Sequence, residues 1–435
     1  MSLLALGLLA QESESPLKLK SQMGLRYMST HNRGNLADFN TQVFFGQFKA
    51  DYAIKPWLTF SGQLNGIYLP WTSGLEERDV LTGRGPIYEA NLFNMRTMTG
   101  QTELALPILN AQINHLGHIL TIGRFTRDVQ AFRHERWPFP NALEGIWYEN
   151  YTAEKASWQL ALIHRVMPRF SGDFEKVGDA IGVAGIGVNP DGTPSGYRNQ
   201  VDSNVLIAAN YNRQLSNDMT IDVWNYWMDN LMNTVLLEPK VHWSDQAITL
   251  SAKLMYQFKV GDGGNALENL RYVQDDRALY FGVRAEKQLG KSSLQFNLTR
   301  ITNDGRFLMP RELGFEPFYT FQRRTRIEGV ANAWALMIKW KKAWVDQAFK
   351  YQFNTSIGKN KLPHITDFAN NKYRVPSHLH WDAELKIQPL KKLTGLTAEV
   401  LVAYRFLAAN VDNEMQVLIN QADFFHTDMR LTYTF

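Results

Sequence analysis

Apolar and polar side chains alternate with a period of two along most of the chain. Between Leu396 and Phe406 the even positions are apolar, whereas Glu399 and Arg405 occupy odd positions. The same alternation runs through 248–258 and through the last seven residues, 429–435. A period of two places successive side chains on opposite faces of a β-strand. The pattern therefore predicts strands with one apolar face and one polar face that carries charged side chains.

About eighteen segments follow this rhythm. They lie near residues 17–28, 38–54, 56–69, 89–107, 116–126, 143–151, 155–167, 202–213, 218–228, 232–243, 246–259, 277–289, 291–303, 330–341, 344–357, 377–389, 394–409 and 421–435. Short connections, such as Lys55-Pro56 and Gly290-Lys291, mostly alternate with long ones, such as 168–201 and 304–329, although the turn at 107–115 is less short. Short periplasmic turns and long extracellular loops are typical of a transmembrane barrel. The fold class expected is all-β, a transmembrane antiparallel β-barrel of about 18 strands.

The first ten residues are the longest apolar run of the chain. No stretch reaches the roughly 18–20 consecutive apolar residues of a transmembrane helix. Residues 1–10 instead resemble a signal-peptide remnant, with cleavage expected between Ala10 and Gln11. A buried N-terminal helix is the alternative. Export without a membrane helix leaves a secreted or periplasmic protein, or a barrel of the bacterial outer membrane formed by 11–435 as a single domain.

Composition excludes several other classes of protein. The 435 residues contain no cysteine, which rules out a disulfide scaffold, thiolate metal sites and a cysteine nucleophile. Lys plus Arg number 46 and Asp plus Glu 42, and this excess of four charges is too small to indicate a nucleic-acid partner. Phe, Tyr and Trp number 25, 17 and 12, a content that favours strands over a disordered chain.

Two long connections, 127–142 and 304–329, are rich in arginine and aromatic residues. Side chains of this size favour loops that fold inward and narrow the lumen. Guanidinium groups offer forked donors to carboxylate or phosphate, and several in series would let an anionic group pass from site to site. The alternative is that these arginines pair with carboxylates of the same loops and rigidify them.

The segment Asp304–Arg326, with its Phe-Leu-Met-Pro-Arg-Glu and Glu-Pro-Phe-Tyr-Thr-Phe stretches, resembles a loop of OprD-family porins from Bacteroidetes. The 123–145 loop and the 420–426 ending before the last strand are similar too. The resemblance implies an eighteen-stranded barrel that passes small carboxylate-bearing solutes, such as amino acids or small organic acids, through an arginine ladder and an inward-folded constriction loop. It implies a monomer as well. The candidate pore-lining residues are Arg124, Arg127, Arg133, Arg136, Arg284, Arg300, Arg306, Arg311, Arg323, Arg326, Arg405, Arg430, Glu399 and Tyr319.

By strand parity Arg284, Arg405 and Arg430 should face the lumen, whereas Arg124 and Arg300 fall on the apolar register at strand ends. Acidic lumen candidates are Glu103, Glu238, Glu286, Asp382, Glu384 and Glu399, so the lumen should carry both signs.

No catalytic residue and no cofactor is expected, because the sequence carries no nucleophile elbow, Walker loop or zinc-protease helix. His378 and His380 share one strand face but make an incomplete metal site. The expected partners are outer-membrane lipid or lipopolysaccharide, a small solute, and a further protein at the extracellular loops. Two alternatives remain: a barrel plugged by its own loops that serves as a structural or docking component, and a soluble exported β-sandwich that binds carbohydrate.

Overall fold

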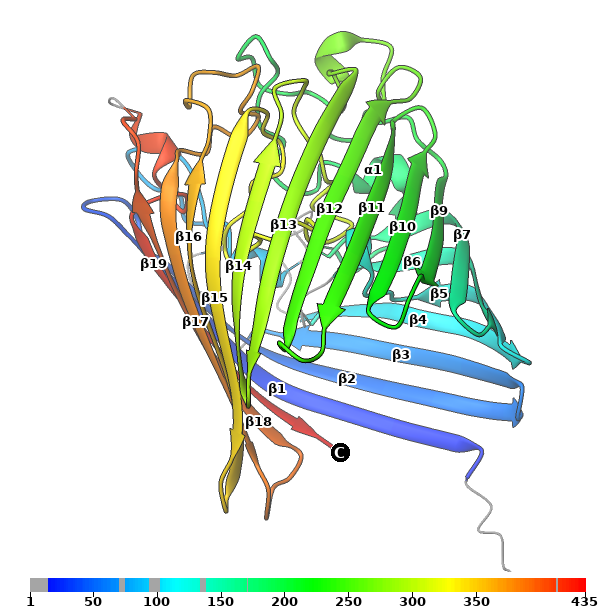
Figure 1. The fold of residues 1–435 in the computed structure, drawn as a ribbon. Helices are drawn as coiled ribbons and strands as arrows, with labels where there is room; N and C mark the ends of the chain where they lie inside the picture. The colour runs from blue at the N-terminus through cyan, green and yellow to red at the C-terminus, as the bar shows by residue number, and fades with distance from the viewer. Residues whose placement is uncertain (1–14, 70–74, 94–101, 134–137, 170, 412–413) are drawn as a thin grey trace, which may run out of the picture.

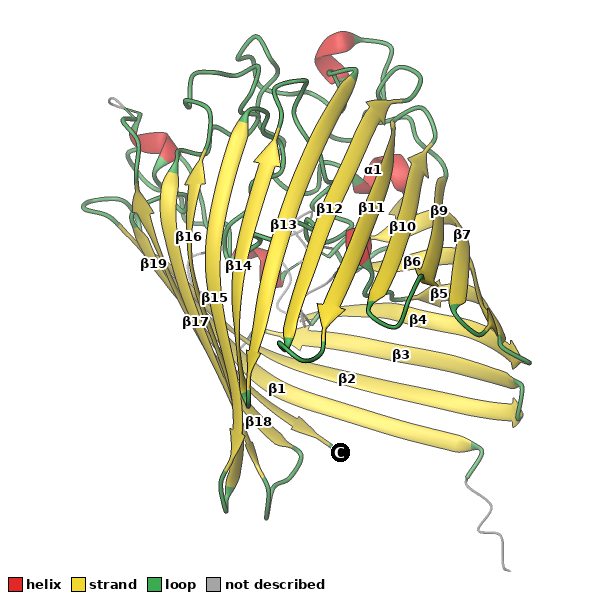
Figure 2. Ribbon diagram, in the orientation of Figure 1, coloured by secondary structure: helices red, strands yellow, loops and turns green. Residues whose placement is uncertain are grey.

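A single antiparallel sheet closes on itself to form a barrel (Figures 1 and 2). The structure, a computed structural model of the chain, describes residues 15–69, 75–93, 102–133, 138–169, 171–411 and 414–435. The expected signal-peptide remnant, 1–10, and the connection between it and the barrel lie outside these residues. No described helix is long and apolar enough to cross a membrane.

Eighteen long strands form the wall, and a two-residue strand, β8, is added at its rim. The strands are β1 (Leu17–Asn32), β2 (Phe39–Lys55), β3 (Leu58–Tyr68), β4 (Thr102–His115), β5 (His118–Phe125), β6 (Ala142–Ala153), β7 (Ala156–Met167), β8 (Glu175–Lys176), β9 (Leu206–Gln214), β10 (Met219–Met228), β11 (Met232–Trp243), β12 (Ile248–Lys259), β13 (Arg277–Leu289), β14 (Ser292–Ile301), β15 (Ala333–Val345), β16 (Phe349–Lys361), β17 (His378–Pro389), β18 (Leu396–Leu407) and β19 (Phe424–Thr434). Helical turns are short: α1 (Val177–Ala180) and the 3-10 turns Ala90–Leu92, Gln130–Phe132, Glu268–Leu270 and Met415–Val417.

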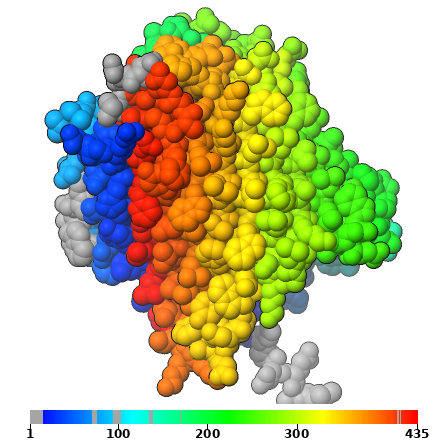
Figure 3. Space-filling model, turned by 60° about the vertical axis from the view of Figure 1, so that its left-hand side comes forward, coloured from blue at the N-terminus to red at the C-terminus, as the bar shows by residue number. Residues whose placement is uncertain are grey.

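The last strand closes the barrel against the first. β19 pairs with β1 from Gln22 opposite Thr434 to Asn32 opposite Phe424. In Figure 3 the red C-terminal strand accordingly lies beside the blue N-terminal one. Closure matters because it leaves no strand edge with unpaired backbone groups, which hydrocarbon could not solvate.

The alternation read from the sequence decides which way each side chain points. On β14, Phe296 is 53% exposed on the outer face, whereas the neighbouring Gln295 and Asn297 are buried inside. The outer face of the other strands is likewise lined by exposed large apolar side chains such as Leu104, Leu336 and Met429. The strand faces of the barrel are thus apolar outside and polar inside, as a membrane-spanning barrel requires.

The expected turn at 107–115 is wrong, and Pro107 explains why. Residues 102–115 form one strand, β4, and the turn lies at Leu116 and Gly117, which both have positive φ as a tight hairpin needs. Pro107 cannot donate to a ladder, and the register between β3 and β4 shifts at this point, between Gln63 and Asn65. The bulge accommodates the proline, so the strand does not end there. The expected strand at 89–107 also begins too early, because Ala90–Leu92 is a helical turn.

The interior is filled unevenly. Loop residues such as Phe132, Leu308 and Phe318 pack with the inner faces of strands from β6 to β15 in the largest buried cluster. In Figure 1 the yellow segment between β14 and β15 runs behind the strands, inside the wall. The inner faces from β15 to β19 carry mostly polar side chains instead. This asymmetry leaves a polar space along one side of the lumen.

Candidate functional site: a polar cavity beside the inner loop

A cavity of about 650 Å³ lies inside the barrel between loop 304–329 and the inner faces of β13–β19 and β1. Eight basic and five acidic side chains line it together with polar and aromatic ones. The basic residues are Arg26, Arg133, Arg284, Arg323, Lys339, Lys341, Lys386 and Arg430, and the acidic ones are Asp128, Asp382, Glu384, Glu399 and Asp428. The remaining lining includes Phe315, Phe318, Tyr319, Phe321 and Gln322 from the loop.

Hydrogen bonds fix loop 304–329 to the wall on both sides. The Tyr319 hydroxyl donates to Glu238 on β11 (2.8 Å), and its backbone amide donates to the Tyr280 hydroxyl on β13 (3.2 Å). The Thr320 hydroxyl donates to Thr299 on β14 (2.8 Å). These bonds hold the loop across the lumen, so its aromatic tip forms one side of the cavity.

The Gln322 side chain extends the attachment further along the wall, to β16 and β17. Its amide donates to the Ser356 hydroxyl on β16 (3.0 Å) and to the Asp382 carboxylate on β17 (3.3 Å). Ring stacking adds to the packing, because Tyr280 and Phe318 lie face to face with centroids 4.5 Å apart. The loop is thus bound to an arc of the wall that runs from β11 to β17.

A buried carboxyl group shapes the loop itself. Glu316 accepts hydrogen bonds from the backbone amides of Ile327 (2.9 Å) and Glu328 (3.2 Å), which joins the two arms of the loop. Burial raises the pKa of Glu316 to about 7, against the opposing attraction of Arg326. The proton on this group is therefore held up to neutral pH.

One side of the cavity presents cations to the solute space. Arg284 donates from Nε to the Asn297 side chain (2.7 Å), and its guanidinium lies 4.4 Å from the centre of the Tyr319 ring. Lys339 and Lys341 follow on the inner face of β15. Among the described residues, these three make no ion pair with a carboxylate within 4 Å.

The other side is a set of ion pairs. Glu384 pairs with Arg323 of the loop (3.3 Å), and Glu399 pairs with Arg430 and with Lys386 (3.5 Å). Because Glu384 and Glu399 are each paired with a cation, this side of the cavity carries little net negative charge.

Asp428 on β19 is a buried carboxylate of this wall. Arg26 of β1 grips it with two bonds, from Nε (2.9 Å) and from the terminal nitrogen (2.6 Å). Arg324 of the loop pairs with the same carboxylate and also donates from Nε to the His426 ring (2.9 Å). The carboxylate therefore joins the first strand, the last strand and the inner loop, at the point where the barrel closes.

The structure brings six of the fourteen predicted pore residues to the cavity: Arg133, Arg284, Arg323, Arg430, Glu399 and Tyr319. Parity predicted Arg284 and Arg430 correctly. Five more arginines lie inside the barrel or its loop layer but in packing roles, namely Arg127, Arg306, Arg311, Arg326 and Arg405. Arg136 lies outside the described residues.

Two of these five arginines illustrate the packing role. Arg306 bonds Asp275 (3.4 Å), and Arg311 pairs with Glu328 while it stacks on Tyr373 at 3.7 Å. The Arg311 pair matches the alternative interpretation, in which loop arginines pair with carboxylates of the same loop and rigidify it, whereas the Arg306 pair joins this loop to another connection.

Arg124 and Arg300 were expected to line the pore, but both lie on the outer face of the barrel. Arg124 shares the face of Ile122, which is 46% exposed, and pairs with Glu144 (2.7 Å). Arg300 stacks at 4.9 Å on Trp334, which is 46% exposed. Both follow the alternation of their strands. A position near the end of a strand therefore does not turn their side chains inward.

Several cavity residues were not on the sequence-based list: Arg26, Lys339, Lys341, Lys386 and Asp428. Strand parity could have identified these residues, because it places their side chains on the inner face of the barrel. Lys339 and Lys341 alternate with the outward-facing Ile338 and Trp340. Lysines attract anions as arginines do, so the same parity predicts a cationic inner face here.

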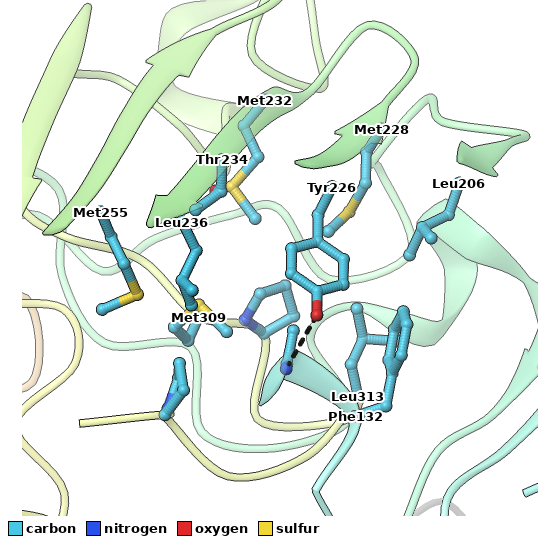
Figure 4. Close-up of a pocket in the computed structure, with 13 residues that line it drawn as sticks. Phe132, Leu206, Tyr226, Met228, Met232, Thr234, Leu236, Met255, Met309 and Leu313 are labelled. Carbon is cyan, nitrogen blue, oxygen red and sulfur yellow. Dashed lines mark hydrogen bonds between the residues drawn. The ribbon is translucent and has the colours of Figure 1, made fainter. Parts of the chain in front are cut away.

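A second pocket is an apolar void and no solute site. It holds about 20 Å³ and is lined by Leu206, Tyr226, Leu236, Leu313 and a group of methionines. Figure 4 shows Met228, Met232, Met255 and Met309 around this space, with the Tyr226 hydroxyl accepting a bond from the Ala131 amide (3.5 Å). Flexible methionines fill irregular gaps where loop and wall meet. No cluster of three or more potential metal ligands occurs among the described residues.

Comparison with known proteins supplies the fold relationship. No family model matches the sequence, and no curated protein does. Among solved structures, the chain is similar to Acinetobacter baumannii OccAB4, with a TM-score of 0.70, 11% identity, and coverage of 97% of this chain and 98% of that one. Pseudomonas aeruginosa OccK9 (OpdG) gives a TM-score of 0.68 at 11% identity, covering 97% and 99%.

A third solved structure, Pseudomonas aeruginosa OpdK with vanillate, gives a TM-score of 0.62 at 14% identity, covering 96% and 98%. These proteins are non-enzymatic porins of the OprD family, so the expected resemblance is confirmed at the level of fold. The chain has the fold of a bacterial outer-membrane porin. The narrower likeness to porins from Bacteroidetes stays a prediction.

Proposed function

We propose that this chain is an outer-membrane porin that lets small carboxylate-bearing solutes, such as amino acids or organic acids, diffuse passively past an arginine- and lysine-lined constriction. The observation that carries the proposal is the cavity of about 650 Å³ beside loop 304–329, with eight basic and five acidic residues around it. Cavities of about 300–1,000 Å³ hold ligands of drug size, so a small acid has room.

The distribution of charge supports selection by carboxylate. Arg284, Lys339 and Lys341 face the solute space without a paired carboxylate among the described residues, so each can donate to an anion. Several donors at separate heights let a solute leave one site as it enters the next, which passive conduction needs. The paired carboxylates on the other wall offer acceptors to an ammonium group, which suits zwitterions as well as simple acids.

The neighbour's ligand agrees with this class of solute. OpdK was crystallised with vanillate, an aromatic carboxylate. The cavity of this chain combines cations with the rings of Phe315, Phe318, Tyr319 and Phe321, which suit a planar apolar body beside a carboxylate. We take vanillate as the first test solute for that reason.

The test is single-channel recording of the purified mature chain in a planar bilayer under a salt gradient. We expect stepwise currents, a reversal potential that shows anion preference, and reversible block by vanillate or an amino acid. The matched amine without a carboxyl group should block less. Block by amine and acid alike would exclude selection by carboxylate.

A plugged barrel with a docking or structural role is the second candidate, and the large buried cluster between loop and wall favours it. The two candidates differ in the same recording. Protein that inserts and stays silent would exclude the channel and turn attention to a partner at the long extracellular loops.

A further inference from the structure

Four titratable side chains lie together on the outer face of the barrel, where charge is unexpected. Arg124 on β5, Glu144 on β6 and Arg165 on β7 are cross-strand neighbours. Arg124 Nε lies 2.7 Å and Arg165 3.7 Å from the Glu144 carboxylate, and His164 Nε2 lies 3.3 Å from it. Three basic groups thus surround one carboxylate.

The cluster faces away from the lumen and lies at the long-loop ends of its strands. It shares the outer face with Ile122, Ile146 and Leu162, which are 46%, 42% and 49% exposed. A charged residue on the lipid face costs about 2–4 kcal/mol at the midplane and about 0–1 kcal/mol near the interface. The cluster therefore belongs at the headgroup level of the outer leaflet.

The wall is hollowed beside this cluster. Gly123 pairs with Gly145 across β5 and β6, and the register shifts at Glu144 and Gly145. A hollow of about 610 Å³ results, and its lining contains the charged Arg124 and Glu144. Apolar side chains form the rest of it: Leu109, Ile122, Ile146, Leu162 and Val205.

A second hollow adjoins the first at the seam between β7 and β9. β9 pairs with β7 only as far as Leu206 opposite Ile163, and beyond that point β7 pairs with β8 instead. The resulting gap holds about 830 Å³ and shares His164 and Val205 with the first hollow. Its lining adds Arg165 and Lys176, together with the acidic Glu175 and Asp179.

The two guanidinium groups are held in place without using all their donors. Arg124 lies over the Phe174 ring at 4.5 Å, and Arg165 donates to the Phe174 backbone carbonyl. Each guanidinium has five N–H donors, of which Glu144 and Phe174 accept only some. Fixed guanidinium groups with donors to spare suit a phosphate group, whose non-bridging oxygens they can bond in parallel.

We propose that this outer hollow binds one phosphate-bearing lipid of the outer leaflet, with an acyl chain on Leu109, Ile122, Ile146 and Leu162 and the phosphate at Arg124, His164 and Arg165. Apolar side chains beneath two arginines that have donors to spare are the arrangement that an anionic amphiphile matches. The site rests on the membrane-spanning barrel of the proposed function, but it does not depend on what the lumen passes.

Native mass spectrometry of the full-length mature protein tests this site. The protein is released from nanodiscs that contain dimyristoylphosphatidylglycerol, and in parallel from nanodiscs with neutral dimyristoylglycerol. We expect one retained phosphatidylglycerol and little retained diacylglycerol. Loss of two charge-assisted contacts should lower retention in Arg124→Gln/Arg165→Gln by more than tenfold.

Arg300→Gln is the matched control, because Arg300 is also an outward arginine near the long-loop end of its strand but stacks on Trp334 and lines neither hollow. It should retain lipid as the wild type does. Glu144→Gln should retain more, because the competing carboxylate is gone, whereas a merely structural ion pair predicts no gain. Equal retention of both lipids, or of phosphatidylglycerol in the double variant, would overturn the proposal.

Two further outcomes have defined meanings. Binding of inorganic phosphate alone by lipid-free protein, with no lipid retained, would mean an anion site and also overturn the lipid assignment. Channel recordings on the same preparations separate this proposal from the porin. A silent barrel that retains the lipid would defeat the channel and leave the lipid site standing.

Discussion

Glu316 illustrates how one buried side chain can set the behaviour of the inner loop. Its carboxyl accepts two backbone amides from residues 327 and 328, and its pKa is about 7 because burial disfavours the charge. In the unfolded loop the pKa would be near the ordinary 4.5. Below about pH 4.5 both states hold the proton. Between 4.5 and 7 the unfolded state ionises first, so the folded loop loses stability as the pH rises, and above 7 the loss is constant.

Glu316→Gln should therefore stabilise the loop at neutral and alkaline pH. Gln resembles the protonated carboxyl, and a shift from 4.5 to about 7 corresponds to about three-hundredfold in an opening equilibrium. Amide hydrogen exchange at Ile327 and Glu328 should slow by up to that factor at pH 8. The difference from wild type should vanish toward pH 4.5. Slower exchange at every pH would contradict the titration argument.

At this scale the sequence predicted some residues well and others poorly. Parity is a local property, so it assigned Arg284 and Arg430 to the cavity. Parity also predicted that Arg124 and Arg300 point outward. The hypothesis of an arginine ladder nevertheless counted them as candidates for the pore lining. Loop arginines such as Arg306 and Arg311 follow no period, and their carboxylate partners lie 31 and 17 residues away in sequence. No local pattern identifies such pairs.

At the scale of elements, the strands were predictable because each is specified by its own alternation. β4 is the exception, since a proline interrupted the pattern and only its pairing with β3 reveals the bulge that accepts it. The inner loop is harder. Its composition indicated an inward fold, but its position depends on contacts with β11, β13, β14, β16 and β17.

The absence of cysteine from the chain allows a direct test of whether the loop moves. The hydroxyl oxygens of Thr299 on β14 and Thr320 in the loop lie 2.8 Å apart, close enough for a disulfide in their place. We expect Thr299→Cys/Thr320→Cys to oxidise readily and to conduct equally in the oxidised and reduced states. The physical reason is that the solute space lies beside the fixed loop. The two single variants control for the substitutions, and a current that changes on reduction would show that the loop swings.

At the scale of the whole molecule, the net charge of the chain says little about the lumen. Folding sorts the charges, so that eight basic and five acidic residues face one cavity while the outer wall is largely apolar. The sequence showed that both signs would be inside. It could not show which carboxylates would be neutralised, because pairs such as Arg26 with Asp428 join opposite ends of the chain.

Reversing two of those charges should invert the ion selectivity of the pore. Lys339→Glu/Lys341→Glu would leave six basic and seven acidic residues around the cavity, since both lysines line it from the inner face of β15. Field lines in a narrow, low-dielectric lumen concentrate the favoured counter-ion, so the change should be large. We expect the reversal potential in a salt gradient to change sign from anion to cation preference, and block by vanillate to weaken strongly.

Lys342→Glu is the matched control for this change. Lys342 follows Lys341 directly but points to the outer face, where its ammonium lies 5.7 Å from the centre of the Trp344 ring. Lys342→Glu makes the same change of charge as each of the two lumen substitutions does, and it should leave the reversal potential where it is. If Lys342→Glu shifted the potential as much as the double variant does, selectivity would follow the overall charge of the protein and the lumen assignment would fail. Since neighbouring residues then differ only in the face they occupy, the comparison measures the effect of strand alternation on conduction.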